Sequence, residues 1–186
     1  MSYSTDRGSL VSAGNLEVLA SHARSTPPGA FVEVGVYRGG SARVLYEIAE
    51  RQGRTLWLFD TFDGHPTPGV EDSTAHPKGR FADCADPQDL ALEMPGVRVV
   101  IGPFPWSLYH YYPQLGLAAV AFAHIDVDLY DSTREAITGL LSFMVPGGVM
   151  YFDDYGVDDC PGATKAVDEL CPGRIILPNG KAIWRR

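Results

Sequence analysis

The sequence is poor in basic residues, in cysteine and in long apolar runs, and each shortage excludes a class of protein. Its 186 residues include 15 Lys and Arg against 23 Asp and Glu, for a formal net charge of −8. The basic residues are scattered except for the final pair, so nucleic acid is not expected as a partner. No apolar stretch is long enough for a membrane span, and the polar N-terminus lacks the pattern of a secretory signal.

The three cysteines, Cys84, Cys160 and Cys171, are odd in number and lack the spacing of a metal-binding motif. Free thiols in a reducing compartment are the simplest interpretation, so we expect a cytoplasmic protein. The length suits a single domain over residues 1–186, with an N-terminal helical extension at 1–29 and a core at 30–186.

Short apolar runs alternate with helical periodicities along most of the chain. Strands are expected at 31–36, 55–59, 97–101, 118–125, 149–152, 175–177 and 182–184. Helices are expected at about 9–24, 40–53, 87–94, 106–112, 131–144 and 163–170, with Pro146-Gly147-Gly148 ending the fifth. Asn179-Gly180 indicates a hairpin. The alternation predicts an α/β fold, a doubly wound, mostly parallel seven-stranded sheet with one antiparallel strand from the hairpin.

A glycine-rich turn follows the first expected strand. Its spacing is Glu-x-Gly-x-x-x-Gly-x-Ser, from Glu33 through Gly35 and Gly39 to Ser41. The dinucleotide fingerprint is Gly-x-Gly-x-x-Gly, so a nicotinamide oxidoreductase is disfavoured. A strand, a tight loop and a helix start in this order let backbone N–H groups meet a ligand.

Acidic residues stand at the ends of several expected strands, where a doubly wound sheet binds its ligands. Asp60 ends the second strand, 27 residues after Glu33, which suits a carboxylate that accepts the two hydroxyls of a ribose. The alternative is that Asp60 only caps the turn that follows it.

Asp126, Asp153 and Asp154 end two strands that we expect to be neighbours. Crowded carboxylates raise one another's pKa values, and a hard divalent cation such as Mg²⁺ or Ca²⁺ relieves that penalty. The alternative is that Asp153 and Asp154 cap the next segment and that Asp128 begins a helix.

These motifs together resemble the class I S-adenosylmethionine-dependent methyltransferases, and more closely the macrocin O-methyltransferase family, which methylates sugar hydroxyls on natural products. The resemblance covers about residues 31–170. It rests on Glu33-Val-Gly-Val-Tyr-Arg-Gly-Gly-Ser41, Phe59-Asp-Thr-Phe-Asp-Gly64, His124-Ile-Asp-Val-Asp-Leu-Tyr-Asp-Ser-Thr133, Gly147-Gly-Val-Met-Tyr-Phe-Asp-Asp-Tyr155 and Ala163-Thr-Lys-Ala-Val-Asp-Glu169.

The resemblance implies S-adenosylmethionine and Mg²⁺, or another divalent cation, as cofactors. The methionine part of the cofactor would lie on Glu33, Gly35, Tyr37, Gly39 and Ser41, its ribose on Asp60, and its adenine near 81–83 and 102–104, including Asp83 and Gly102. Thr61 is also expected to contact the cofactor. Asp126, Asp153 and Asp154 match the family's magnesium ligands. Asp126 would also border the cofactor and act as the catalytic base.

A metal-bound acceptor hydroxyl ionises more readily, and a nearby carboxylate takes its proton. Two alternatives remain: methyl transfer without a metal, with Asp126 or His124 as the base, and a non-catalytic domain that only binds the cofactor. His124 also has a purely structural interpretation.

The expected partner is a small-molecule acceptor, with no nucleic acid and no membrane, and the aromatic residues suggest a homodimer. Members of the resembled family carry a longer N-terminal region over the acceptor. Here the acceptor site would be more open, completed by a partner subunit, or formed by the 61–80 loop with His65 and His76. Trp106, Tyr109, Tyr111 and Tyr112 would either form an acceptor wall or fill core and interface.

Overall fold

The computed structural model describes residues 9–115, 117 and 119–186, and for residues 111–115 only the backbone. Its centre is a seven-stranded sheet in the order β3-β2-β1-β4-β5-β7-β6. The strands are β1 (Ala30–Val34), β2 (Leu56–Asp60), β3 (Arg98–Ile101), β4 (Val120–Ile125), β5 (Met144–Phe152), β6 (Ile175–Ile176) and β7 (Ala182–Arg185). The helices are α1 (Ala13–Arg24), α2 (Gly40–Arg51), α3 (Pro87–Glu93), α4 (Trp106–Leu115), α5 (Tyr130–Leu140) and α6 (Pro161–Leu170).

The first five strands are parallel, and the chain winds outward from β1 in both directions. β2 and β3 lie on one side of β1, while β4 and β5 lie on the other. β7 pairs antiparallel with both β5 and β6, which confirms the predicted closing hairpin. The gap between β1 and β4 is therefore the topological switch point, where such sheets bind ligands beyond the carboxyl ends of their strands.

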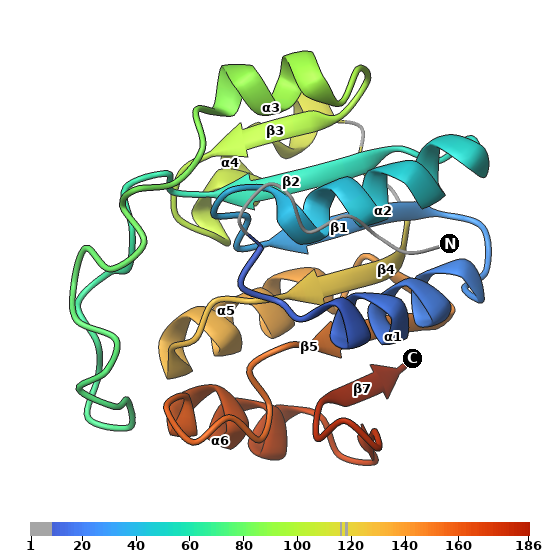
Figure 1. The fold of residues 1–186 in the computed structure, drawn as a ribbon. Coiled ribbons are helices and arrows are strands. Elements are labelled where there is room, and N and C mark those ends of the chain that lie inside the picture. Colours follow the sequence, from blue (N-terminus) through green and yellow to red (C-terminus); the bar gives the residue numbers. More distant parts are fainter. Residues whose placement is uncertain (1–8, 116, 118) are drawn as a thin grey trace.

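Helices cover both faces of the sheet (Figure 1). Side chains alternate along each strand, so Phe31 and Val32 of β1 belong to two different core layers. The layer with Phe31 packs on α1, α2 and α3, and includes Leu16, Leu45 and Leu90. The layer with Val32 packs on α4, α5 and α6, and includes Leu108, Ile137 and Val167. The doubly wound α/β prediction is confirmed.

Two helix starts have side-chain caps. Ser12 accepts a hydrogen bond from the Asn15 N–H at the start of α1. Asp86 accepts from the Gln88 N–H, and Pro87 occupies the first turn of α3. α2 differs, because Gly39 precedes it with φ +80° and supplies no side-chain cap. Its first N–H groups are thus left for another partner.

One predicted boundary is wrong. Met144 was expected on the inner face of a helix that Pro146-Gly147-Gly148 ends, but α5 ends at Leu140 and residues 144–148 begin β5. The pairing of β4 with β5 shifts register here, and Gly147 takes φ +78°. Pro146 therefore lies in an irregular strand start, where its missing N–H interrupts no regular ladder.

Candidate functional site

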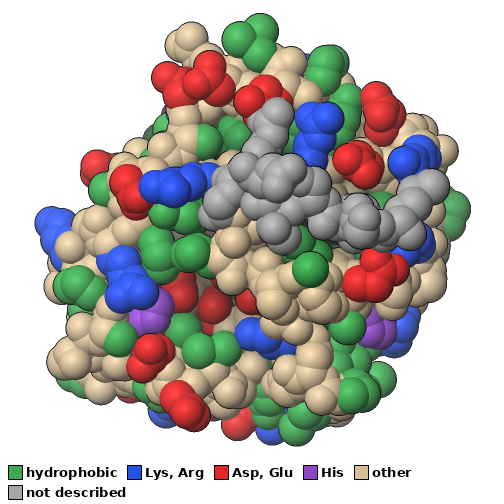
Figure 2. Space-filling view, viewed as in Figure 1, with side chains coloured by type: hydrophobic (Ala, Val, Ile, Leu, Met, Phe, Trp, Pro, Cys, Tyr) green, Lys and Arg blue, Asp and Glu red, His purple; other side chains and the backbone are tan. Residues whose placement is uncertain are grey.

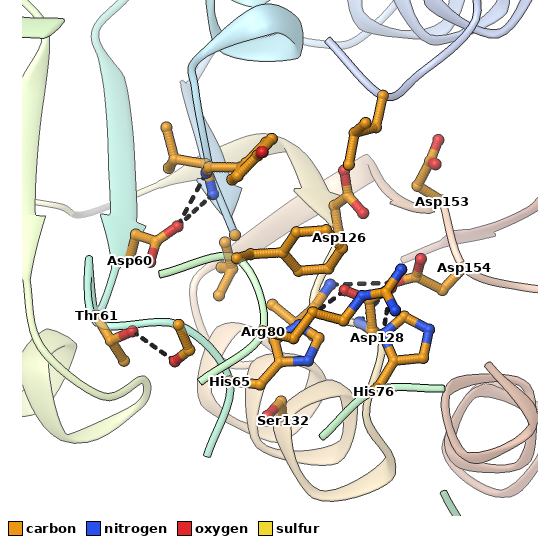
Figure 3. A pocket seen from close by; sticks show the side chains of 18 of the residues that line it. Asp60, Thr61, His65, His76, Arg80, Asp126, Asp128, Ser132, Asp153 and Asp154 are labelled. Carbon is orange, nitrogen blue, oxygen red and sulfur yellow. Dashed lines mark hydrogen bonds and ion pairs between the residues drawn. The ribbon is translucent and has the colours of Figure 1, made fainter. Parts of the chain in front are cut away.

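A cavity of about 940 Å³ opens at the switch point. Its walls are the loop after β1, the ends of β2, β4 and β5, and the long loop over residues 61–80. In Figure 1 that loop extends beyond the carboxyl ends of the parallel strands. Figure 2, in the same view as Figure 1, shows charged side chains of both signs spread over the visible face of the molecule, not one large basic patch. Acidic side chains converge inside the cavity (Figure 3).

The glycine loop is tightly packed against the rest of the protein. Gly35 has φ +88°, and a Cβ atom built on it would lie 1.8 Å from the backbone oxygen of Asp126. Gly39 has φ +80°, and its Cβ would lie 2.6 Å from Leu90 Cδ2. Gly35 is thus required by its contact with backbone, whereas at Gly39 the positive φ is the stronger constraint, because the end of the Leu90 side chain can move. Gly35 also lines the cavity. Ser41 lines it from the first turn of α2.

Asp60 joins two loops through its carboxylate. Oδ2 accepts hydrogen bonds from the N–H groups of Val36 (2.7 Å) and Tyr37 (3.1 Å), and Oδ1 accepts one from Phe62 N–H (2.9 Å). The turn-capping alternative is therefore present in the structure. A carboxylate has about four acceptor positions, so Asp60, which lines the cavity, keeps capacity for a ligand hydroxyl.

Glu33 lies elsewhere than expected. It is fully buried beneath the glycine loop and does not line the cavity. Its Oε1 lies 2.7 Å from Nδ1 of His124, which is also fully buried. Glu33 therefore contacts the cavity only through its neighbours. His124 is too deeply buried to touch an acceptor in the cavity, so the geometry supports its structural interpretation.

The remaining predicted cofactor residues divide into two groups. Tyr37, Thr61 and Gly102 line the cavity, and Thr61 donates to the Gly64 carbonyl oxygen at 3.2 Å. Gly39 and Asp83 do not line it. The exposed Asp83 carboxylate instead accepts from the Tyr37 hydroxyl at 3.2 Å and pairs with Arg38.

The predicted metal ligands do come together. Asp126, Asp153 and Asp154 each offer an oxygen within 4.8 Å of the others. Asp154 Oδ2 accepts from the N–H groups of Val127 (3.0 Å) and Asp128 (2.8 Å), which fixes its orientation. Asp153 Oδ1 is buried and has no hydrogen-bond partner among the residues that the structure describes. A buried carboxylate oxygen without a hydrogen bond, in an all-oxygen donor set, suits a hard divalent cation.

The shifted pKa values of the three carboxylates also favour a cation site. Burial, and then the charges of Asp154 and Asp153, raise the pKa of Asp126 well above its usual value. Burial, followed by Asp128 and Asp153, does the same to the pKa of Asp154. Burial alone would also raise the pKa of Asp153, but His124 and Lys181 outweigh it and lower that pKa. A cation among the three would relieve the repulsion.

A second cluster was not predicted as a unit. His65 and His76 of the 61–80 loop meet Asp128 and Cys160 beside Asp154. Burial, as the largest effect, lowers the pKa of His76. The signal available in the sequence was the Asp-x-Asp pattern, which places Asp128 just after the end of β4. Cys160 gave no such signal.

The predicted aromatic acceptor wall is only partly described. Trp106 and Tyr109 are more than half exposed and do not line the cavity. The side chains of Tyr111 and Tyr112 lie outside the described residues. Phe81 and Phe104 are aromatic residues that do line the cavity.

Comparison with known proteins gives a consistent result. A family model described as macrocin O-methyltransferase (TylF) matches residues 15–171. The 8-demethyl-8-(2,3-dimethoxy-alpha-L-rhamnosyl)-tetracenomycin-C 4'-O-methyltransferase of Streptomyces olivaceus is 30% identical over an alignment of 151 residues, which covers 73% of this chain and 56% of that protein. The demethyldecarbamoylnovobiocin O-methyltransferase of Streptomyces niveus is 32% identical over 183 residues, covering 86% of this chain and 66% of the relative. The chain thus spans less than two thirds of either relative.

Among solved structures, the O-methyltransferase NovP superposes with a TM-score of 0.76 at 24% identity, over 96% of this chain and 81% of that one. This likeness shows the fold. Within the described part of the chain, no helix is long and apolar enough to cross a membrane.

Proposed function

The chain belongs to the macrocin O-methyltransferase family, and we propose that it transfers a methyl group from S-adenosylmethionine to a hydroxyl of a small molecule, such as a sugar on a natural product. The observation that carries the proposal is that one cavity unites the glycine loop held by Asp60 with the carboxylates of Asp126, Asp153 and Asp154. The two relatives are named for O-methylation of natural products, which supports this acceptor class.

The cofactor would occupy the part of the cavity beside β1 and β2. The N–H groups at the uncapped start of α2, together with Ser41, suit the carboxylate of its methionine part. The free acceptor capacity of Asp60 suits the ribose. Gly102 and Phe104, which border the cavity near β3, suit the adenine. Glu33, Gly39 and Asp83 act through neighbouring residues in this arrangement, since none of them lines the cavity.

When bound, the cofactor supplies a sulfonium methyl group and the divalent cation stabilises the oxyanion of the acceptor. Asp126, Asp153 and Asp154 would hold that cation. Asp126 would also take the acceptor's proton, because its carboxylate lines the cavity in which the acceptor would bind. Methyl transfer is an in-line displacement, so the main task of the scaffold is to position the two reactants.

Positioning begins with Asp60. Its hydrogen bonds to Val36 and Tyr37 hold the glycine loop in a single conformation, so little ordering is left to occur when a ligand binds. Asp154 does the same for the loop after β4, through Val127 and Asp128. The two carboxylates thus hold opposite walls of the cavity.

Calorimetric titration with S-adenosylhomocysteine, with and without Mg²⁺, tests the cofactor site. We expect binding by the wild type and a strong loss in Asp60→Ala. Asp131→Ala is the matched control, because this exposed carboxylate pairs with Arg134 and does not line the cavity, and it should bind as the wild type does. Absence of binding by folded wild type in either condition would overturn the proposal. Adding a chelator to a methylation assay separates the metal-assisted reaction from a metal-free one.

A further inference from the structure

The 61–80 loop brings two histidines back to the protein body. His65 Nε2 lies 3.0 Å from Asp128 Oδ2, and His76 Nδ1 lies 3.4 Å from Asp128 Oδ1. Cys160, the residue before α6, places its sulfur 3.5 Å from His76 Nε2 and 3.4 Å from Asp128 Oδ1. Side chains from three separate segments therefore converge on one point, and Figure 3 shows both histidines directed at Asp128.

His65, His76 and Asp128 each offer one donor atom, and these atoms all lie within 4.8 Å of one another, close enough for a single cation to bridge them. With Zn–N bonds of about 2.0 Å and Zn–S bonds of about 2.3 Å, tetrahedral ligands lie about 3.3–3.6 Å from one another. Two separations from Asp128 Oδ1 match that range, 3.4 Å to His76 Nδ1 and 3.4 Å to Cys160 Sγ. His76 would bind through Nδ1, because one imidazole gives a single nitrogen to a cation.

The side chains are also short of partners. His76 is 4% exposed, and within the described residues neither its Nδ1 nor that of His65 has a hydrogen-bond partner. Asp128 adopts φ +60°, and its carboxylate contacts both histidines.

We propose that His65, His76, Asp128 and Cys160 form a binding site for a divalent transition cation of the Zn²⁺ class. The site is separate from the all-oxygen set of Asp126, Asp153 and Asp154, because two imidazoles and a thiolate are donors that Zn²⁺ and its neighbours prefer and that Mg²⁺ does not. On coordination the thiol of Cys160 releases its proton to solvent.

The bound cation would fasten the 61–80 loop over the cavity. The loop is already held at its middle, where Asp72 Oδ1 accepts from the Tyr130 N–H at the start of α5, and at its base, where His65 and Arg80 pair through the backbone. A cation at His65 and His76 would add a link from both arms of the loop to Asp128, just after β4, and to Cys160 at the start of α6.

Cobalt(II) is the probe, because tetrahedral nitrogen and sulfur ligation gives it visible absorption bands and a thiolate charge-transfer band in the near ultraviolet. Metal-stripped wild-type protein should show both at one equivalent of Co²⁺. Zn²⁺ should remove them, and excess Mg²⁺ should not. His65→Ala combined with His76→Ala should weaken Co²⁺ binding by at least about tenfold, since even changes to groups around metal ligands cost 10–100-fold.

Matched variants assign the bands. Cys160→Ser should lose the charge-transfer band, whereas Cys84→Ser, which changes a free thiol outside the cluster, should keep it. Asp153→Asn should keep both bands, because Asp153 belongs only to the oxygen site. The proposal is overturned if wild type shows no bands, if Cys160→Ser retains the charge-transfer band, or if Asp153→Asn abolishes the spectrum while circular dichroism shows it folded. Should the double histidine variant fail to fold, the Cys160→Ser spectrum decides alone.

Discussion

Glu33 and His124 face each other from adjacent strands, with Oε1 and Nδ1 2.7 Å apart and both side chains fully buried. The other ring nitrogen of His124 lies 3.9 Å from Asp153 Oδ1. Burial lowers the pKa of His124, but its two carboxylate neighbours outweigh that effect and raise it well above its usual value. Glu33, His124 and Asp153 thus form a row of buried ionisable side chains, and Asp153 at its end is a predicted metal ligand.

Glu33→Ala should therefore destabilise the protein more than it weakens cofactor binding. Removing one partner of a buried ion pair leaves the other charge uncompensated and costs about 3–5 kcal/mol of unfolding free energy. Urea denaturation measures this loss. Glu17→Ala is the control, since its pair with Arg24 is exposed and worth about 0–1 kcal/mol. Should folded Glu33→Ala lose affinity for S-adenosylhomocysteine with its stability unchanged, a direct cofactor contact would be the better explanation.

Gly35→Ala should be among the most damaging single-atom changes in the chain. The added Cβ would meet the Asp126 carbonyl oxygen at 1.8 Å with φ at +88°. Overpacking costs about 1–3 kcal/mol, and a left-handed conformation adds about 1–2 kcal/mol. Gly53→Ala separates the two effects, because Gly53 has φ +64° with no atom within 4 Å, so only the second cost applies. Thermal melting of both variants tests the difference, and equal losses would contradict the packing argument.

Much of the architecture could be predicted because it follows from local patterns. The seven strands, the hairpin and the acids at strand ends are encoded in alternating apolar runs and in turn residues. The sheet order then brings Asp126, Asp153 and Asp154 together, since their strands are neighbours. Periodicity failed at Pro146, because a register shift and a positive φ at Gly147 let a strand begin where proline suggests a break.

Contacts between distant segments could not be predicted in the same way. Glu33 and His124 are 91 residues apart, and only the pairing of β1 with β4 reveals that Glu33 points into a core layer away from the cavity. The meeting of His65 and His76 with Cys160 depends on the path of a long loop whose composition gives no periodicity. Neither contact has a local sequence signal, although the individual residues can be read from the sequence.

Cys171 should make the protein sensitive to alkaline pH. Burial raises the pKa of its thiol from 9.0 to about 12, so the folded state retains the proton longer than the unfolded state does. Its contribution is fully present below about pH 9 and is lost as pH rises from there toward 12, with a slope of at most about 1.4 kcal/mol per pH unit. Cys171→Val, of similar size and without a proton to lose, should show a shallower decline between pH 9 and 10.5 in urea denaturation. Parallel curves for the two proteins would contradict the assignment.

Asp126→Asn and Asp153→Asn test the chemistry of the oxygen site. Each change removes one negative charge from the three carboxylates while preserving shape, so turnover should fall to the detection limit. Affinity for S-adenosylhomocysteine should stay within a fewfold of the wild type, because the proposed cofactor contacts are on the side of β1 and β2. In the metal-free protein Asp126→Asn should also raise the melting temperature at pH 8, where the folded state otherwise bears the cost of ionising a carboxyl whose pKa is raised.

Glu135→Gln, which changes an acid that lines the cavity outside the cluster of Asp126, Asp153 and Asp154, is the matched control for the turnover measurements and should retain activity. If Asp153→Asn instead abolished cofactor binding and spared turnover, the metal role of this carboxylate would be wrong.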